Sequence, residues 1–154
     1  MAAVLGKDAK MYYQSSGVRA TWPGSGAAPN LVEMTNVKDA STNLEKDEAD
    51  LTTRGSGGWK ITVPTFKDGT VEFEMVWDTA DAGFVAIQNA YFGDATIAIA
   101  VLDGLKDAAG SKGLWADFGV AKFSRNEPLT EALTVSVTLK PGYSTVAPEW
   151  VTVA

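Results

Sequence analysis

Four consecutive residues near the middle of the chain, Asp47-Glu48-Ala49-Asp50, have the composition of the acidic tetrad with which nucleotide-hydrolysing helicases bind magnesium. That chemistry needs a buried strand just before the tetrad and a phosphate-binding loop of the form G-x-x-x-x-G-K-[ST]. The preceding text "STNLEK" is polar, and "GLKDAAGSK" has Ala109 where the second glycine is required. The sequence therefore favours a solvated acidic segment over a nucleotide site.

Other groups of polar residues are weaker candidates for chemistry. Glu72 and Glu74 have a spacing that a glycosidase can use, but they fit better on the wet side of an amphipathic strand. The run "KDEAD" lacks the D-x-[DN]-x-[DN]-G pattern of a calcium loop. The glycines of "GSGGW", Gly55 to Trp59, favour a hinge or tight turn over an anion site, since no helix follows them. We expect no catalytic, cofactor or metal site.

Composition excludes further classes of function. The 154 residues include no histidine and no cysteine, which removes common metal ligands, thiol nucleophiles and the usual general base. A formal charge of −6 repels nucleic acid, so sequence-specific DNA binding is not expected. The chain has no run of about 18 apolar residues and no signal-peptide pattern, so we expect cytoplasmic synthesis without membrane insertion. Its length suits one domain, residues 1–154.

Alternation of apolar and polar residues predicts a mainly β fold. We expect six or seven strands with mostly antiparallel pairing, forming an antiparallel β-sandwich or half-open barrel. One flanking α-helix is expected at about residues 79–92, capped by Asp78 or Thr79 and stopped by a left-handed Gly93. An Asp68-Gly69 turn is expected to join two of the strands as a hairpin. The expected strands include residues 11–14, 59–64, 71–77, 97–101, 114–124 and 133–139.

The acidic tetrad lies in a segment, Thr42 to Gly58, that has no face able to join a core. We expect this segment to be a long extended arm, exposed to solvent and ending in a glycine cluster. Ordering such a segment costs roughly 1 to 2 kcal/mol per residue. The arm is therefore expected to become ordered only against a partner surface.

The order of these elements and several short sequence segments resemble those of a known protein family. "TTRGSGGW", "EMVWDTAD" and "SRNEPL" stand in sequence between about Asn36 and Pro141. Over that range the chain is similar to the major tail tube proteins of tailed phages and prophages. The resemblance includes no catalytic signature, in agreement with the absence of a defensible active site.

The resemblance implies a structural protein of the virion tail, present in the host cytoplasm during assembly. Members of this family have a β-sandwich or barrel with one flanking helix and associate into hexameric rings. The rings stack into a tail tube through which DNA passes without specific binding. The implied partners are other copies of the chain, the tail terminator, the baseplate or tip, and the tape measure protein.

The resemblance also implies where the subunits meet. The arm of residues 42–58 matches a family connection that reaches a neighbouring subunit or ring, and the N-terminal segment and the C-terminal tail, residues 142–154, are further expected assembly elements. The candidate inter-subunit residues of the arm are Thr42, Glu45, Asp47, Glu48, Asp50, Arg54, Gly55, Gly57 and Gly58.

Three alternative functions stay open at the level of sequence. The chain fits a monomeric β-sandwich module that binds a ligand or carbohydrate, and solution mass would distinguish that module from a self-assembling protein. A hydrolase that uses carboxylates alone is permitted, although no residue pair supports it. The tube subunit of a phage-derived injection system or gene transfer particle would have the same sequence features. The five tryptophans are expected to serve core packing and subunit contacts.

Overall fold

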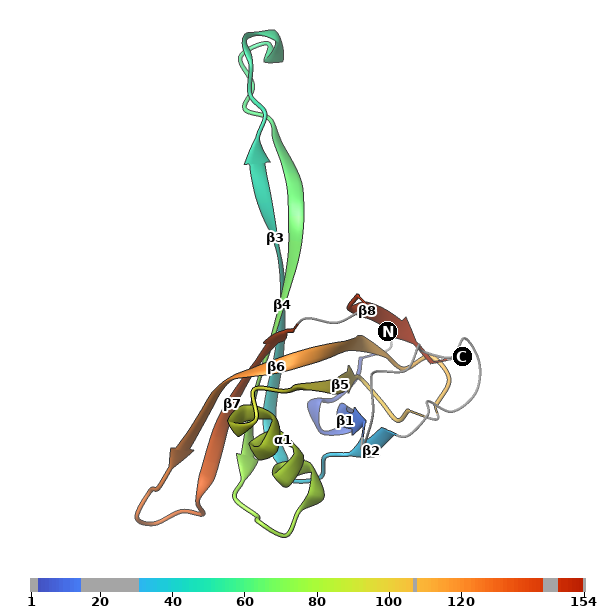
Figure 1. Ribbon diagram of the computed structural model, residues 1–154. Helices are drawn as coiled ribbons and strands as arrows, with labels where there is room; N and C mark the ends of the chain where they lie inside the picture. The colour runs from blue at the N-terminus through green and yellow to red at the C-terminus, as the bar shows by residue number, and fades with distance from the viewer. Residues whose placement is uncertain (1–2, 15–30, 107, 143–146, 154) are drawn as a thin grey trace.

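The computed structural model describes residues 3–14, 31–106, 108–142 and 147–153 (Figure 1). Within them, eight strands form one antiparallel sheet in the order β2-β1-β5-β6-β7-β4-β3, and β8 pairs with β6. The predicted mainly β, antiparallel fold with one helix is therefore confirmed, although the strands are longer than expected. The strands are β1 Lys10–Gln14, β2 Leu31–Glu33, β3 Val37–Asp50, β4 Thr62–Val76, β5 Thr96–Leu102, β6 Lys112–Asn126, β7 Thr134–Pro141 and β8 Glu149–Thr152.

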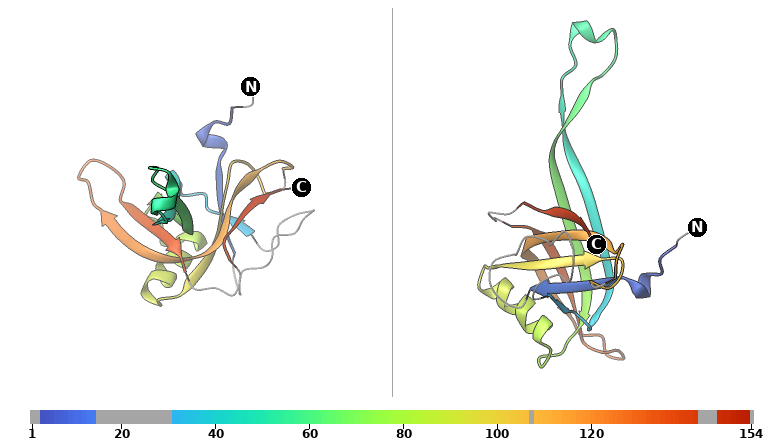
Figure 2. Two further views of the ribbon diagram at one scale, coloured as in Figure 1. Left: turned by 90° about the horizontal axis from the view of Figure 1, so that it is seen from above. Right: turned by 90° about the vertical axis from the view of Figure 1, so that its right-hand side faces the viewer.

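Strand β6 makes the sheet curl, because its two halves have different partners. Its first half pairs with β5 and β8, whereas its second half, from Phe118 to Asn126, pairs with β7. The register of the second pairing shifts between Val120 and Lys122, which marks a bulge of the kind that bends a strand. Seen from above, the sheet is an open curve rather than a closed barrel (Figure 2).

The main core lies on one face of this curved sheet. Alternate residues of β4 and β7 point into it, as the period of a half-buried strand requires. Helix α1, Ala82–Phe92, covers the core with Phe84 and Ile87, both fully buried. The strand residues that meet there include Val71, Phe73, Met75, Phe118, Val135, Val137 and Leu139.

The helix begins later than predicted because a turn occupies the first three expected positions. The Asp78 carboxylate accepts a hydrogen bond from the Ala80 N–H, and Asp81 caps the helix by accepting one from the Phe84 N–H at 2.9 Å. The predicted left-handed stop at Gly93 is wrong, since Gly93 has φ −89°. Asp94 has the positive φ instead, at 51°. Asp tolerates that conformation better than most residues.

A second, smaller core lies on the other side of the sheet. Trp115 is its largest member, 1% exposed, and β8 contributes Val151. The alternation of β5 had suggested a single apolar face, yet residues on both of its faces are buried. Strand β8, near the C-terminus, is therefore an integral part of the sheet. The other members are Tyr12, Leu31, Ala98, Ala100, Leu102 and Val153.

Strands β3 and β4 continue together beyond the body as a long two-stranded hairpin (Figure 1). The predicted Asp68-Gly69 turn is wrong: both residues lie inside β4, where they pair with Glu45 and Leu44. The exposed arm is present, but it is one half of this hairpin rather than an isolated extended segment. Its backbone groups are paired with those of β4, so the arm needs no neighbour to satisfy them.

Candidate assembly surfaces

The hairpin ends in a compact turn at residues 51–61. A short 3₁₀ helix, Arg54–Ser56, begins with a capping box in which the Thr53 N–H donates to Ser56 Oγ at 3.0 Å. Gly57 and Gly58 follow with φ of 65° and 86°, a conformation that favours glycine. The predicted glycine cluster thus forms a tight turn. Its exposed cationic residues are Arg54 and Lys60.

Asp50 anchors the start of this turn. Its Oδ1 accepts a 2.9 Å hydrogen bond from the Thr52 N–H. Hydrogen bonds from the Thr52 side chain and backbone lower the pKa of the Asp50 carboxyl. Across the hairpin, Ile61 N–H donates to Thr52 Oγ1 at 2.9 Å. Asp50 therefore has a local structural role at the tip.

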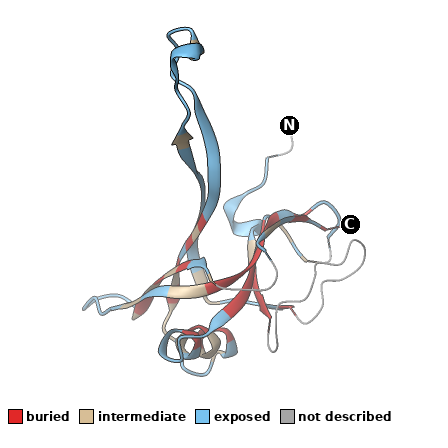
Figure 3. Cartoon of the chain, turned by 45° about the horizontal axis from the view of Figure 1, so that its top comes forward, coloured by how far each residue is buried: buried red, intermediate tan, exposed pale blue. Residues whose placement is uncertain are grey.

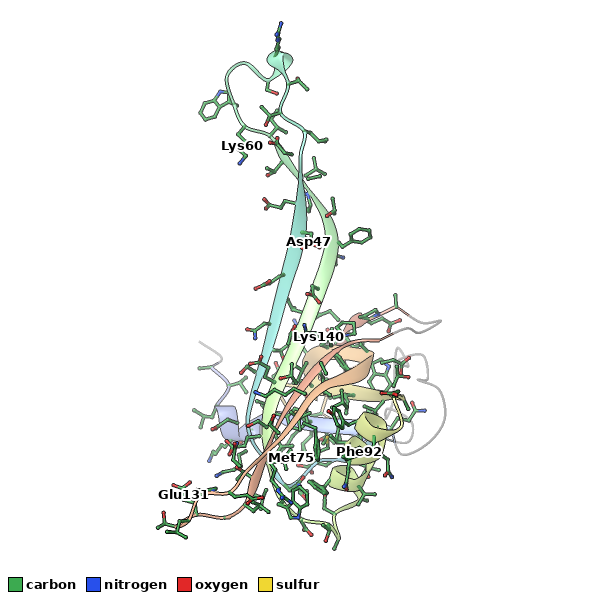
Figure 4. The ribbon with its side chains drawn as sticks, turned by 60° about the vertical axis from the view of Figure 1, so that its left-hand side comes forward. Asp47, Lys60, Met75, Phe92, Glu131 and Lys140 are labelled. Atoms are coloured by element: carbon green, nitrogen blue, oxygen red, sulfur yellow. The ribbon has the colours of Figure 1, made fainter. Side chains whose placement is uncertain are left out.

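The acidic tetrad runs along an exposed strand. Consecutive side chains of a strand point to opposite faces, so Asp47 and Glu48 do not converge on one point. Figure 4 shows Asp47 midway along the arm, far from Met75 in the body. Among the described residues, no group of three or more His, Cys, Asp or Glu side chains is placed to hold a metal ion. The tetrad has the geometry of a solvated face.

The hairpin exposes large apolar side chains that have no core to join. Figure 3 shows the arm almost entirely exposed above its root. Trp59 near the tip and Phe66 on β4 are each 77% exposed. Apolar surface of this extent on a polar element indicates an interaction site. The remaining exposed apolar residues of the hairpin are Leu44, Leu51, Ile61 and Val63.

Phe66 lies at an irregularity of the hairpin that the sequence analysis did not find. The register shifts between the pairs Lys46–Lys67 and Glu48–Pro64, so Thr65 and Phe66 together oppose Asp47. This is the two-against-one arrangement of a β-bulge. Such a bulge has no local sequence signal, because it becomes evident only once the partner strand is known.

The body of the sheet has a polar face opposite the main core. Glu72 pairs with Ser41 on one side and Thr138 on the other, and Glu74 pairs with Ser136. Both carboxylates therefore lie on the wet side of their strand, as the sequence predicted. A shallow hollow of about 280 Å³ opens on this face. We call the set Ser41, Glu72, Glu74, Lys122, Ser124, Ser136 and Thr138 the polar face.

A separate groove of about 350 Å³ opens where β1 and β2 meet the root of β3. Its lining includes the largely buried Met11 and Met34, which give it an apolar floor. The sequence analysis missed this groove, since it is built from residues 6–11, 33–40 and 101, which are far apart in the chain.

An aromatic cluster lies at the end of helix α1. Tyr91 stacks on Phe123 with ring centroids 5.8 Å apart, and Phe92 contacts both rings while remaining 70% exposed. Of the tryptophans, Trp115 is buried in a core, as expected, whereas Trp150 is 60% exposed. Trp22 lies outside the described residues. No helix in the described part of the chain is long and apolar enough to span a membrane.

A protein-family model described as phage tail tube protein matches residues 24–142 of the chain. No curated protein sequence matches it.

Several solved structures resemble this chain, among them the following three. A chain from the tail of an empty gene transfer agent (GTA) particle, refined with C6 symmetry, has a TM-score of 0.70 and 14% identity, and the match covers 97% of this chain and 99% of that one. The SPP1 tail tube has a TM-score of 0.67 and 19% identity, with 90% and 75% covered. A chain of the anti-feeding prophage baseplate has a TM-score of 0.52 and 10% identity, with 92% and 90% covered. These likenesses establish a shared fold.

Proposed function

Because the chain belongs to the phage tail tube protein family, we propose that it is a structural virion protein whose copies form hexameric rings that stack into a tail tube. The tube conducts the genome during delivery. One observation carries the proposal: over β4, β7 and the second half of β6, the sheet packs the main core on one face and keeps the polar face open on the other. A tube wall needs this division between a packed outer layer and a wetted inner surface.

The polar face is the proposed lining of the tube. Glu72 and Glu74 place two carboxylates per subunit there, and Lys122 provides one cation. DNA that slides through such a lining meets a net negative wall, so the phosphates are repelled and the duplex stays mobile. The short polar side chains Ser124, Ser136 and Thr138 provide no stacking platform for bases.

The two edges of this face are the proposed lateral contacts. Strand β3 forms one edge. Residues 120–126 of β6 form the other, because β5 pairs with β6 only as far as Gly119. Open edges expose unpaired backbone groups, and closing the sheets into one barrel removes such edges. The aromatic cluster around Phe123 lies beside the second edge and supplies apolar area for the same contact.

The hairpin is the proposed axial contact. It projects past the body (Figure 1), so it reaches a neighbouring ring while the polar face stays within its own ring. The arm residues from Thr42 to Gly58 keep their proposed inter-subunit role, with β4 as an additional part of the same element. The N-terminal segment and residues 142–154 are proposed as further assembly elements. The proposed partners at the tube ends are the tail terminator, the baseplate or tip, and the tape measure protein.

The function needs no active site, and we propose a purely structural role. A tube subunit of a gene transfer particle is a second candidate, because the GTA tail chain matches this chain over nearly its full length. Both candidates predict the same assembly. A monomeric ligand-binding module predicts no assembly. That alternative also does not account for the six large apolar side chains exposed on the hairpin.

Concentrated purified protein, imaged by negative-stain electron microscopy and sized by light scattering, tests the proposal. We expect rings or tubes with a central channel and sixfold symmetry. A chain that remains strictly monomeric at every salt concentration, and forms no tubes when expressed in cells, contradicts it. Tubes built from rings of another symmetry contradict the hexameric part alone.

A further inference from the structure

The side of the hairpin that bears Phe66 is acidic. Asp47 opposes Phe66 across the bulge, and Glu45 lies directly opposite Asp68 on the same side. Like charges placed directly opposite each other in a sheet destabilise the pair. Among the described residues no ion pair offsets these carboxylates. The hairpin therefore presents an exposed aromatic ring beside three unpaired carboxylates.

The groove at the root of β3 has the opposite character. Lys7, Lys10 and Lys38 line it, and Glu33 is the one acidic residue among the described residues of its lining. Glu33 forms an ion pair with Lys10, with Oε1 and Nζ 3.6 Å apart. Lys7 and Lys38 make no ion pair within the described residues. The chain has a net charge of −6, so a cationic rim is a local exception on an acidic protein.

The floor of the groove is apolar. Met11 and Met34 are 5% and 4% exposed, and Val101 lines the groove beside them. Methionine adapts its shape and makes favourable contacts between sulfur and aromatic rings. A groove of about 350 Å³ with such a floor suits an aromatic side chain, and its lysine rim suits flanking carboxylates.

The hairpin of the same molecule does not reach this groove. Val37, which lines the groove, pairs with Met75, and Phe66 lies nine residue steps before Met75 along the continuous strand β4. At about 3.3 Å per residue the ring lies about 30 Å from its own groove, on a hairpin that points away from it. Only another copy offers a Phe66 side chain within reach.

We propose that the groove at the root of β3 is the docking site for the hairpin of a second copy, with Phe66 on the methionine floor and Asp47 and Asp68 against Lys7 and Lys38. This proposal rests on the proposed function and names the surface that receives the arm. Donor and acceptor surfaces lie at different places on one subunit, so the contact is head-to-tail. A head-to-tail contact between successive rings can repeat along an axis, as a stacked tube requires.

Cysteine cross-linking tests the contact directly, because the chain has no native cysteine. Thr65→Cys beside the docking ring and Lys38→Cys at the groove are combined in one chain, and assembled protein is treated with a short bismaleimide. We expect a ladder of covalent oligomers. Each single variant should give no product beyond a dimer. The matched control, Thr65→Cys with Leu129→Cys, uses a fully exposed loop residue and should give no ladder. A ladder in the control, or none in the test pair, overturns the proposal.

Charge exchange tests the chemistry of the contact. Asp47→Lys with Asp68→Lys, or Lys7→Glu with Lys38→Glu, should each lower the yield of tubes about tenfold, since like charges then meet. All four changes in one chain should restore tubes. Thermal melts of the monomer should agree among these variants, which separates assembly from folding. If the fourfold variant assembles no better than the double variants, the groove is not the docking site of the hairpin.

The outcome for the wild type keeps the two proposals distinct. If the wild type forms tubes and every charge variant forms them with the same yield, the docking site is overturned and the proposed tube formation stands. A wild-type chain that never assembles overturns both.

Discussion

The ring of Trp77 meets the ring of Phe84 edge to face, with centroids 4.8 Å apart, and the Arg125 guanidinium lies 5.2 Å from the same indole. The contact joins the end of β4 to the start of helix α1 and to β6. It places a fully buried phenylalanine at the point where the helix closes the core. An edge-to-face aromatic pair contributes about 0.5 to 1.5 kcal/mol beyond the area that it buries.

Replacing Phe84 should therefore destabilise the subunit strongly. Phe84→Ala leaves a cavity under the helix, and we expect the free energy of unfolding to fall by about 3 to 5 kcal/mol. Leu129→Ala, at a fully exposed loop residue, is the control and should change it by less than about 0.5 kcal/mol. Urea unfolding at a concentration where the protein is monomeric measures both. Equal losses in the two variants would show that the helix does not pack as described.

The turn at the hairpin tip should depend on Gly58, which has a positive φ, and not on Gly55. Gly58→Ala places a Cβ at φ 86°, which should cost about 1 kcal/mol and open the turn locally. We expect trypsin to cut after Arg54 several times faster in this variant. Gly55→Ala has an ordinary backbone conformation and should leave the cleavage rate unchanged. Equal rates in both variants would contradict the described turn.

Acid should loosen the same turn. The Thr52 hydrogen bonds lower the pKa of Asp50 below its ordinary value of 3.8, so the charged carboxylate stabilises the turn above that pH. This contribution is lost as the pH falls through the lowered pKa. An NMR titration of the Asp50 carboxyl should show its pKa rising toward the ordinary value in Thr52→Val. An unchanged pKa in that variant would mean that the hydroxyl of Thr52 makes no contribution.

The subunit should fold without most of its arm. Leu44 pairs directly with Gly69, so replacing residues 45–68 by Asn-Gly closes a short hairpin at a natural register. The deleted residues 45–68 contribute no side chain to either core cluster. We expect a cooperative thermal melt close to that of the intact monomer and a loss of tubes by electron microscopy. Tubes of normal length from this variant would rule out the hairpin as an axial contact.

Reversing charge on the polar face should change how the assembled tube treats DNA. Glu72→Lys with Glu74→Lys should leave folding intact, because neither carboxylate is buried. It should make tubes retain DNA fragments at low salt and release them at high salt. The control, Glu127→Lys with Glu131→Lys, places the same charges in the β6–β7 loop, where Figure 4 shows Glu131 at a loop end of the body. Retention by the control tubes and not by the test tubes would contradict the proposed lining.

The sequence predicts the fold best where local pattern and tertiary environment agree. The strand expected at residues 133–139 was predicted correctly, because one face of β7 is buried along most of its length. The Asp68-Gly69 dipeptide was misread as a turn. An Asp-Gly dipeptide favours a turn when no neighbouring strand pairs with it. Here β3 pairs with Asp68 and Gly69 and with the residues before and after them, so the dipeptide stays extended.

The assembly surfaces were predictable in part. Polar composition was enough to place the arm of residues 42–58 in solvent. Phe66 was expected in the connection between two strands, beside the Asp68-Gly69 dipeptide, whereas it lies inside β4. The groove depends on Lys7, Glu33 and Lys38, which only the folded chain brings together. Surfaces made from several distant segments leave no periodic signal along the chain.

Because β3 and β4 are paired along the hairpin, the number of paired residues fixes how far the hairpin extends from the body. If the ring at position 66 sits in the groove of the next copy, the axial period of the polymer is set by the number of paired residues between groove and ring. Inserting two residues in each strand, after Asn43 and before Thr70, keeps every side chain on its own face. It should lengthen the period by about 6.6 Å, at about 3.3 Å per residue. Relatives with longer or shorter hairpins would then build tubes whose striations differ in steps of two residues.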